Sequence, residues 1–221
     1  MNLELPLTQL YRAVDPAAGA PWLLILLHGV GSNEADLFGL APAVPGQFHV
    51  LSLRAPFRMG PNAFGWFTFA VRSDGHRVID AEQEMTSRTL LAQVISSSSE
   101  QLSVPAERVV VGGFSQGGIM SLSLLLTRPE LLAAALVMHS RLLPEIEPSV
   151  APVAALQGRR LWVSHGTADA VMPLASAHGI CDRIRELPID LSYAEFPGGH
   201  EIRPAELTAA MTWLNSVQAG S

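Results

Sequence analysis

Short, continuously apolar segments alternate along the chain with longer stretches of helical periodicity. The clearest apolar segment is Trp22–Leu27, which has no polar position, as expected for a strand buried on both faces of a parallel sheet. A final segment, Leu191–Phe196, alternates more between apolar and polar residues and is predicted nearer a sheet edge. Similar short apolar runs predict further strands at Val50–Leu53, Val109–Val111, Ala133–Met138 and Leu161–Val163.

Helical patterns fill the intervals between these predicted strands. Pro204 stands at the start of the last one, where it suits a first helical turn. The alternation of strand and helix predicts an α/β fold with right-handed crossovers, a mostly parallel sheet and helices on both faces. No composition shift marks a linker, so residues 1–221 are expected to form one domain. The predicted helices are Ile79–Leu102, Gly117–Leu126, Leu174–Glu186 and Pro204–Val217.

Length and composition narrow the class of protein. The chain has 221 residues, of which 48% are hydrophobic, which suits one large core and excludes intrinsic disorder. Its single cysteine, Cys181, excludes an internal disulfide. The start of the chain does not resemble a secretory signal, and Trp22–Leu27 is far too short to span a bilayer. We therefore expect a cytoplasmic protein without stable membrane insertion.

The charged residues exclude several kinds of chemistry. The net charge is −6, which argues against nucleic acid as the main partner, since polyphosphates bind clustered basic surfaces. The chain contains no lysine, which removes Walker-type phosphate binding and Schiff-base catalysis. The stretch Arg54–Gly75 is rich in Gly, Pro and aromatic residues, and we expect a long loop or an irregular excursion there.

The most informative motif is Gly113-Phe-Ser-Gln-Gly, between a predicted strand and a predicted helix. In a nucleophile elbow a serine occupies such a sharp turn, and the flanking glycines remove Cβ atoms that would collide. Ser115 is therefore the candidate nucleophile. The alternative is a serine that merely caps a helix after a Gly-rich turn.

A serine nucleophile needs a histidine base and a carboxylate that orients the base. Asp169 and His200 each follow a predicted strand, so both are expected on the same rim of the sheet as Ser115. Their order along the chain, serine, acid, histidine, is the one this kind of site requires. Asp182 and Glu195 are rival acids, but one falls in a predicted helix and the other in a predicted strand.

Three other histidines follow Ser115 along the chain. His178 lies within a helical pattern and is expected at the surface or in the core. His165 is expected to be a buried structural residue beside the acid loop. His139 closes a predicted strand and could line the cleft, at most in a supporting role.

Two backbone N–H groups are candidate oxyanion donors. One belongs to Gln116, directly after the nucleophile, and the other to Val30 in Leu27-His-Gly-Val-Gly. A dinucleotide-binding fingerprint starting at Gly29 is the competing interpretation. It fails because Glu34 occupies the place of the third glycine, and no acidic residue follows near His49.

Five segments together resemble the small carboxylesterase, acyl-protein thioesterase and lysophospholipase family of α/β-hydrolases. The resemblance implies the α/β-hydrolase fold, a triad of Ser115, Asp169 and His200, and oxyanion donation by Val30 and Gln116. It implies no metal and no organic cofactor, and the length leaves little chain for a cap domain. The segments are Leu27-His-Gly-Val-Gly, Arg54-Ala-Pro, Gly113-Phe-Ser-Gln-Gly-Gly, His165-Gly-Thr-Ala-Asp-Ala-Val-Met-Pro and Gly198-Gly-His-Glu-Ile.

Two departures from the family pattern bear on the substrate. His139-Ser-Arg-Leu-Leu-Pro replaces the Ser-Gly-Tyr-Leu-Pro of many members, and we expect a polar or cationic group from this segment, His139 or Arg141, near the cleft. Phe64-Gly-Trp-Phe-Thr-Phe keeps the tryptophan of the family's Trp-Tyr-Asp segment but lacks the acid. We expect substrate contacts from Phe64, Trp66, Val171 and Met172. For Trp66 the alternative is that the indole only supports its loop.

These features predict a serine carboxylesterase that hydrolyses a small-molecule ester through an acyl-enzyme intermediate. An acyl-protein thioesterase or a lysophospholipase is the alternative within the same chemistry. A hydrolase-fold binding module without turnover is the alternative from another class. The open apolar rim expected around the site would also suit a homodimer.

Overall fold

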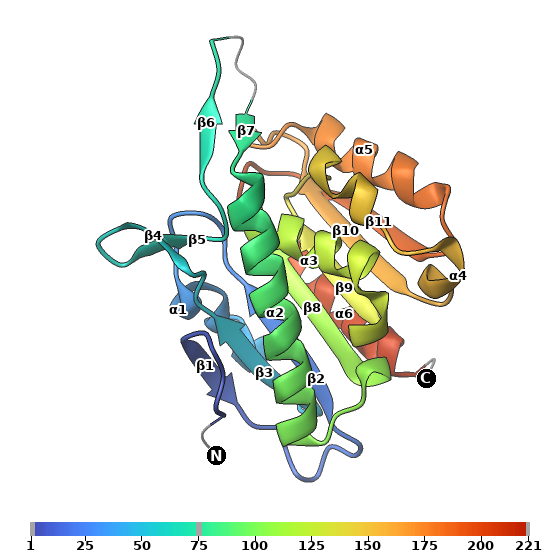
Figure 1. The fold of residues 1–221 in the computed structure, drawn as a ribbon. Helices are drawn as coiled ribbons and strands as arrows, with labels where there is room; N and C mark the ends of the chain where they lie inside the picture. Colours follow the sequence, from blue (N-terminus) through green and yellow to red (C-terminus); the bar gives the residue numbers. More distant parts are fainter. Residues whose placement is uncertain (1–2, 74–76, 220–221) are drawn as a thin grey trace.

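A seven-stranded sheet forms the centre of the computed structural model, which describes residues 3–73 and 77–219. The strand order is β1-β3-β2-β8-β9-β10-β11, and β1 at one edge runs antiparallel to β3 while the other neighbours are parallel (Figure 1). The strands are β1 (Gln9–Arg12), β2 (Trp22–Leu27), β3 (Phe48–Leu53), β8 (Val109–Phe114), β9 (Ala134–Met138), β10 (Arg160–Gly166) and β11 (Asp190–Phe196).

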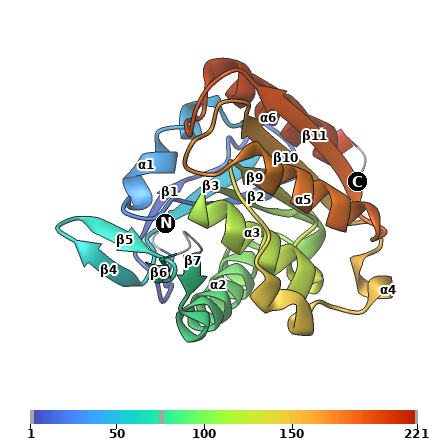
Figure 2. The ribbon, with the colours of Figure 1, turned by 90° about the horizontal axis from the view of Figure 1, so that it is seen from above.

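Helices cover both faces of this sheet, as the alternating pattern predicts. Figure 2 shows α2, α3 and α5 on one face and α1 and α6 on the other. No helix among the described residues is both long enough and apolar enough to cross a membrane. The α-helices are α1 (Glu34–Phe38), α2 (Ala81–Leu102), α3 (Gln116–Thr127), α4 (Val153–Leu156), α5 (Leu174–Arg185) and α6 (Pro204–Ala219). Short 3-10 helices are η1 (Ala41–Ala43), η2 (Ala106–Arg108), η3 (Pro129–Leu131) and η4 (Pro144–Ser149).

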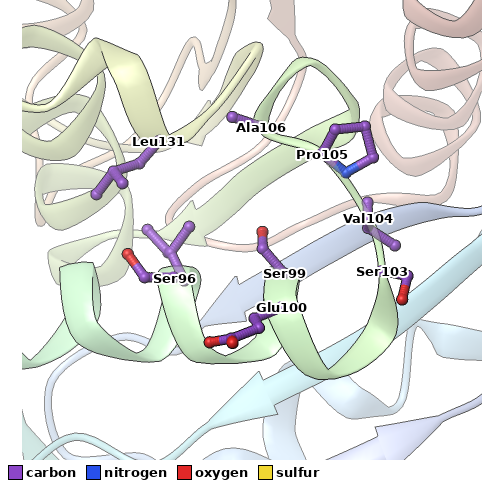
Figure 3. Close-up of a pocket in the computed structure, with 9 residues that line it drawn as sticks. Ser96, Ser99, Glu100, Ser103, Val104, Pro105, Ala106 and Leu131 are labelled. Carbon is purple, nitrogen blue, oxygen red and sulfur yellow. The ribbon is translucent and has the colours of Figure 1, made fainter.

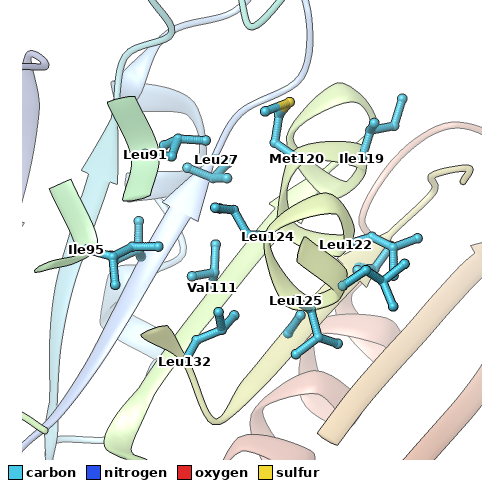
Figure 4. Close-up of a cluster of buried hydrophobic side chains, with 14 of the residues drawn as sticks. Leu27, Leu91, Ile95, Val111, Ile119, Met120, Leu122, Leu124, Leu125 and Leu132 are labelled. Atoms are coloured by element: carbon cyan, nitrogen blue, oxygen red, sulfur yellow. The ribbon is translucent and has the colours of Figure 1, made fainter. Parts of the chain in front are cut away.

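The apolar character of β2 follows from its place between two helical layers. Leu27 points into the cluster that α2 and α3 form with the sheet, where it lies near Leu91 and Leu124 (Figure 4). Leu24 belongs to the cluster on the opposite face, which includes Leu214 of α6. Complete burial of one such side chain is worth about 1.5–3 kcal/mol. Both faces therefore exclude polar residues, and the predicted strand is confirmed.

Two small ribbons replace the expected loop between β3 and α2. Strands β4 (Phe57–Gly60) and β5 (Ala63–Gly65) form one, and β6 (Phe69–Val71) and β7 (Arg77–Ile79) form the other. The end of the stretch predicted as a loop, at Gly75, lies outside the described residues. The β6–β7 ribbon projects beyond the sheet (Figure 1), and no helical cap is inserted among the residues that the structure describes.

Candidate active site

Ser115 occupies a strained turn between β8 and α3. Its backbone has φ 54° and ψ −116°, an uncommon conformation for a residue with a side chain. Two contacts hold the turn: the Ser115 N–H donates to the carbonyl of Met138 at 2.9 Å, and the Ser115 carbonyl accepts from Ser140 Oγ at 3.0 Å. The sheet and the loop after β9 together fix the backbone of the candidate nucleophile.

Glycine is required on both sides of this turn. A Cβ atom on Gly113 would lie 2.2 Å from the carbonyl carbon of Gly117. A Cβ atom on Gly117 would lie 1.9 Å from the carbonyl oxygen of Leu27, at the end of β2. Both distances are far inside van der Waals contact, so the Gly-x-Ser-x-Gly pattern follows from close packing of the turn against the neighbouring strand.

The structure brings Ser115, His200 and Asp169 together in one hydrogen-bonded chain. His200 Nε2 lies 2.9 Å from Ser115 Oγ, and His200 Nδ1 lies 2.7 Å from Asp169 Oδ2. A carboxylate oxygen accepts, so Nδ1 carries the proton and Nε2 is free to accept from the serine hydroxyl. The three residues follow β8, β10 and β11, so they meet at the carboxyl edge of the sheet as predicted.

Asp169 is held as a carboxylate by four donors. Its Oδ1 accepts from the backbone N–H groups of Val171 at 2.9 Å and Met172 at 2.8 Å, while Oδ2 faces two imidazoles. Burial alone raises the pKa of Asp169. The hydrogen bonds from Met172, His200 and His139 outweigh it and lower the pKa to about 2. The group is therefore ionised throughout the neutral range.

The second imidazole on Asp169 belongs to His139, which bridges two buried carboxylates. His139 Nδ1 lies 2.9 Å from Asp169 Oδ2, and Nε2 lies 3.1 Å from Glu206 Oε2. Two carboxyl groups that face the ring favour its protonated form, in which both ring nitrogens donate. Burial lowers its pKa, but the bonds to Glu206 and Asp169 reverse the effect and raise it. Ser164 Oγ completes the network by donating to Glu206 Oε1 at 2.6 Å.

Sequence reasoning anticipated a supporting place for His139 but missed Glu206. An acidic residue in the first turn of a helix is usually explained by the helix dipole, and Glu206 occupies that position in α6. Its full burial and its contact with His139, 67 positions away, appear only in three dimensions.

The remaining histidines and the rival acids lie outside the hydrogen-bonded chain. His165 is buried, donates from Nε2 to the carbonyl of Met172 at 2.7 Å, and has a pKa lowered by burial. His178 pairs with Glu195 at 3.1 Å on the surface, and Asp182 is exposed on α5. The predicted preference for Asp169 over its rivals agrees with this placement.

The two residues that are expected to supply oxyanion donors both border the cleft of Ser115. Val30 and Gln116 both line the cleft with Ser115, and neither backbone N–H donates to a protein acceptor in the part of the chain that the structure describes. The Gln116 side chain connects the loop that contains Trp66 and Phe67 to the turn at Ser115. It accepts from Trp66 N–H at 2.8 Å and donates to the Phe67 carbonyl at 2.7 Å.

The prediction that Trp66 faces the substrate is wrong. Its side chain has 0% exposure, packs against the His28 ring, and donates from Nε1 to the His28 carbonyl at 2.9 Å. Phe64 is half-buried beneath Arg54, whose guanidinium lies 4.7 Å from the ring centre, and does not line the described cleft. Both aromatic side chains fasten their loop to the body of the protein, and neither lines the cleft of Ser115.

We expect Trp66→Ala to destabilise the fold without changing acyl preference. Removing a fully buried tryptophan costs about 3–5 kcal/mol, because it leaves a cavity and here also an unpaired carbonyl at His28. Chemical denaturation should measure this loss, and acetyl and longer-chain esters should lose kcat/KM in equal proportion. A loss confined to bulky esters would mean that the indole contacts the substrate after all.

The cleft beside Ser115 is narrow, with a volume of about 30 Å³. Of the predicted substrate contacts, Met172 lines this cleft, and the exposed Val171 lines a hollow of about 530 Å³ next to it. Arg141, singled out in the sequence, borders both spaces. The remaining walls of the narrow cleft are Phe67, Phe69, Arg77, Ile79 and Ile119.

Another sizeable hollow lies at the opposite edge of the sheet. It has a volume of about 470 Å³ and is formed by the end of α2 and the segment that leads into β8 (Figure 3). Its walls are small or apolar apart from Glu100, and no nucleophile, base and acid converge there. Of these hollows, the cleft at Ser115 is therefore the one in which a nucleophile, a base and an acid lie together.

One group of side chains among the described residues could also supply metal ligands. His139, Asp169 and His200 offer ligand atoms within 4.8 Å of one another. These ligand atoms already form hydrogen bonds with one another, because the Nδ1 atoms of His139 and His200 both bond to Asp169 Oδ2. A metal ion bound by these atoms would have to replace those hydrogen bonds.

Comparison with known proteins places the chain among esterases and thioesterases. Residues 11–218 match the phospholipase/carboxylesterase family. Acyl-protein thioesterase 1 of Gibberella zeae is 30% identical over 173 residues, which cover 75% of this chain and 73% of that protein. Acyl-protein thioesterase 1 homolog 1 of Dictyostelium discoideum is 25% identical over 191 residues, covering 86% and 81%.

Solved structures share the fold over almost the whole chain. The Bacillus cereus carboxylesterase matches with a TM-score of 0.82 and 21% identity, covering 96% of this chain and 95% of that one. The fold is therefore that of the α/β-hydrolases, as the sequence resemblance implies.

Proposed function

Since the chain belongs to the phospholipase/carboxylesterase family of serine hydrolases, we propose that it hydrolyses small-molecule carboxylic esters with Ser115, His200 and Asp169 as its triad. The observation that carries the proposal is the continuous hydrogen-bonded chain from Ser115 Oγ through His200 to Asp169, with distances of 2.9 and 2.7 Å. A serine that only capped a helix would not need a base aimed at its hydroxyl.

In the first half-reaction, Ser115 Oγ attacks the ester carbonyl carbon while its proton passes to His200 Nε2. Asp169 stabilises the imidazolium that forms and keeps the Nδ1 proton in place. The backbone N–H groups of Gln116 and Val30 donate to the oxyanion of the tetrahedral intermediate. The intermediate collapses when the alkoxide leaves and takes the proton from His200, and the acyl group remains on Ser115.

In the second half-reaction, water attacks the acyl carbon and gives its proton to His200. The same oxyanion donors hold the second tetrahedral intermediate. Collapse returns the proton to Ser115 Oγ and releases the carboxylic acid. No atom in this cycle needs to come from a cofactor.

A thioester is the second candidate substrate, because two of the relatives are acyl-protein thioesterases. A thiolate is a better leaving group than an alkoxide, so the same residues serve both reactions. Turnover of an oxygen ester and a thioester with identical acyl groups would rank the two activities directly.

Labelling with a fluorophosphonate probe tests the catalytic proposal. The probe reacts with an activated serine, so we expect one labelled peptide, which contains Ser115, when the digest is read by mass spectrometry. Ser96→Ala on the exposed side of α2 is the matched control and should keep the label. A protein that resists the probe, or is labelled at another serine, would be a binding module or would use another nucleophile.

A further inference from the structure

Two arginines border the cleft from different parts of the chain. Arg77 lies on β7 of the projecting ribbon, and Arg141 lies in the loop after β9. Both line the narrow cleft that contains Ser115 and also the larger hollow beside it. The two arginines therefore lie at the boundary between the cleft and the hollow, where a substrate bound at Ser115 would extend into the larger space.

Arg77 is positioned by two contacts. Its guanidinium lies 5.2 Å from the centre of the Phe69 ring on the neighbouring strand, a cation–π arrangement. One of its N–H groups donates to the Val171 carbonyl at 3.4 Å, which links the ribbon to the loop that carries Asp169. Figure 1 shows the β6–β7 ribbon beside the segment that leads into α5.

Arg141 is half-buried in the loop that follows β9. It makes no ion pair or side-chain hydrogen bond with any residue in the ranges that the structure describes. Burial lowers the pKa of Arg141; the charge of Glu145 opposes this effect, and the positive charge of Arg77 adds to it. A guanidinium in such surroundings is stabilised by an anion that its planar fork of donors can bind.

The large hollow has a third positive feature. Pro173 and Ser176, at the amino end of α5, line it together with both arginines. Backbone N–H groups at the start of a helix attract negative charge. No acidic side chain lines the hollow among the described residues, since its other walls are Ala170, Val171 and Met172.

We propose that Arg141 and Arg77 bind an anionic group, a carboxylate or a phosphate, on the ester that Ser115 hydrolyses. The proposal rests on the proposed function, because the anion site has meaning only as part of a substrate held at Ser115. The scissile carbonyl lies in the narrow cleft, an apolar connecting segment contacts Phe69 and Met172, and the charged end lies in the hollow of about 530 Å³. Esters of this class include half-esters of dicarboxylic acids and acyl esters of phosphorylated alcohols.

The test compares charged esters with neutral partners of nearly the same shape. One arm uses the nitrophenyl half-ester of glutaric acid and its methyl-capped diester, which places the anion on the acyl side. A second arm uses acetoxybenzoate and its methyl ester, which places it on the leaving group. A third arm uses a monoacylglycerol phosphate and the monoacylglycerol. Each pair is measured with the wild type, Arg141→Gln and the control Arg185→Gln, which alters an exposed arginine on α5.

In at least one arm the wild type should prefer the charged ester. Arg141→Gln should lower kcat/KM for that ester by about 10- to 100-fold, mainly through KM, because a charge-assisted bond is lost. The charged-to-neutral ratio of kcat/KM should therefore fall in Arg141→Gln and should keep its wild-type value in Arg185→Gln. The arm that responds identifies which end of the substrate carries the anion, and whether it is a carboxylate or a phosphate.

If the neutral esters are hydrolysed but Arg141→Gln leaves every charged-to-neutral ratio unchanged, the anion site is overturned and the esterase proposal stands. If the wild type hydrolyses none of these esters and resists the fluorophosphonate probe, the esterase proposal fails and the anion site fails with it.

Discussion

Ser115→Ala should abolish ester hydrolysis, with kcat lower by about 10⁶-fold, as for other serine nucleophiles that act as a unit with their base. The physical reason is that water must then attack the ester directly, without the acyl-enzyme. A residual rate about 10³–10⁴-fold above the uncatalysed reaction is expected from the backbone donors and substrate binding. Steady-state hydrolysis of an activated ester, measured over a wide range of enzyme concentrations, gives this number.

The fold of the Ser115→Ala variant should be unchanged, because the side-chain hydroxyl bonds only to His200 while the backbone contacts to Met138 and Ser140 remain. Thermal denaturation should therefore give a Tm close to that of the wild type. Ser96→Ala, on an exposed position of α2, should keep full activity and serves as the matched control. Activity above about a tenth of the wild-type value would place the nucleophile elsewhere.

Apolar runs in the sequence predicted the centre of the fold because parallel strands are buried on both faces. Burial excludes polar residues from β2, so its apolar sequence alone is enough to predict the strand. Strand β1 is half-exposed and only four residues long, and it was not predicted. The ribbons β4–β5 and β6–β7 were also not predicted, because their strands have three or four residues and partly exposed faces.

The candidate triad was predictable because each residue follows a buried strand. Chain order and the common carboxyl edge bring Ser115, Asp169 and His200 together whatever the lengths of the intervening helices. The second hydrogen bond to the acid was not predictable in this way. This bond comes from His139, which is held in place by a contact with Glu206 of α6. No local sequence pattern indicates that contact.

The orientation of Trp66 shows where pattern analysis fails. In a loop without periodicity, nothing in the sequence distinguishes an aromatic ring that faces a ligand from one that faces the core. The deciding contacts are long-range: the His28 carbonyl accepts from the indole and Gln116 holds the Trp66 backbone. Phe69, which shares the same loop, remains exposed and lines the cleft.

Asp169→Asn should lower kcat by about 10⁴-fold while leaving the geometry nearly intact. The backbone N–H groups of Val171 and Met172 will keep the amide oxygen in the place of Oδ1, so the amide nitrogen must face the Nδ1 atoms of both His200 and His139. Two donors cannot share a hydrogen bond, so the imidazole proton moves to Nε2 and the base can no longer accept from Ser115. Asp182→Asn on the exposed surface of α5 is the control and should have no effect on kcat.

The same substitution should change how stability depends on pH. The carboxyl of Asp169 has an ordinary pKa of 3.8, which applies to the unfolded chain, and a lowered pKa of about 2 in the folded protein. The folded state therefore binds its proton less readily, and the carboxylate stabilises the fold above pH 3.8 by an amount on the order of 2 kcal/mol. This contribution disappears as the pH falls from 3.8 through 2. Urea denaturation of the wild type and Asp169→Asn should show a stability difference that narrows steadily as the pH falls below about 4. A stability difference that does not narrow in acid would mean that the hydrogen bonds from His200, His139 and the loop do not favour the ionised carboxyl. Asp169 would then lack the negative charge that the supporting acid of a triad needs.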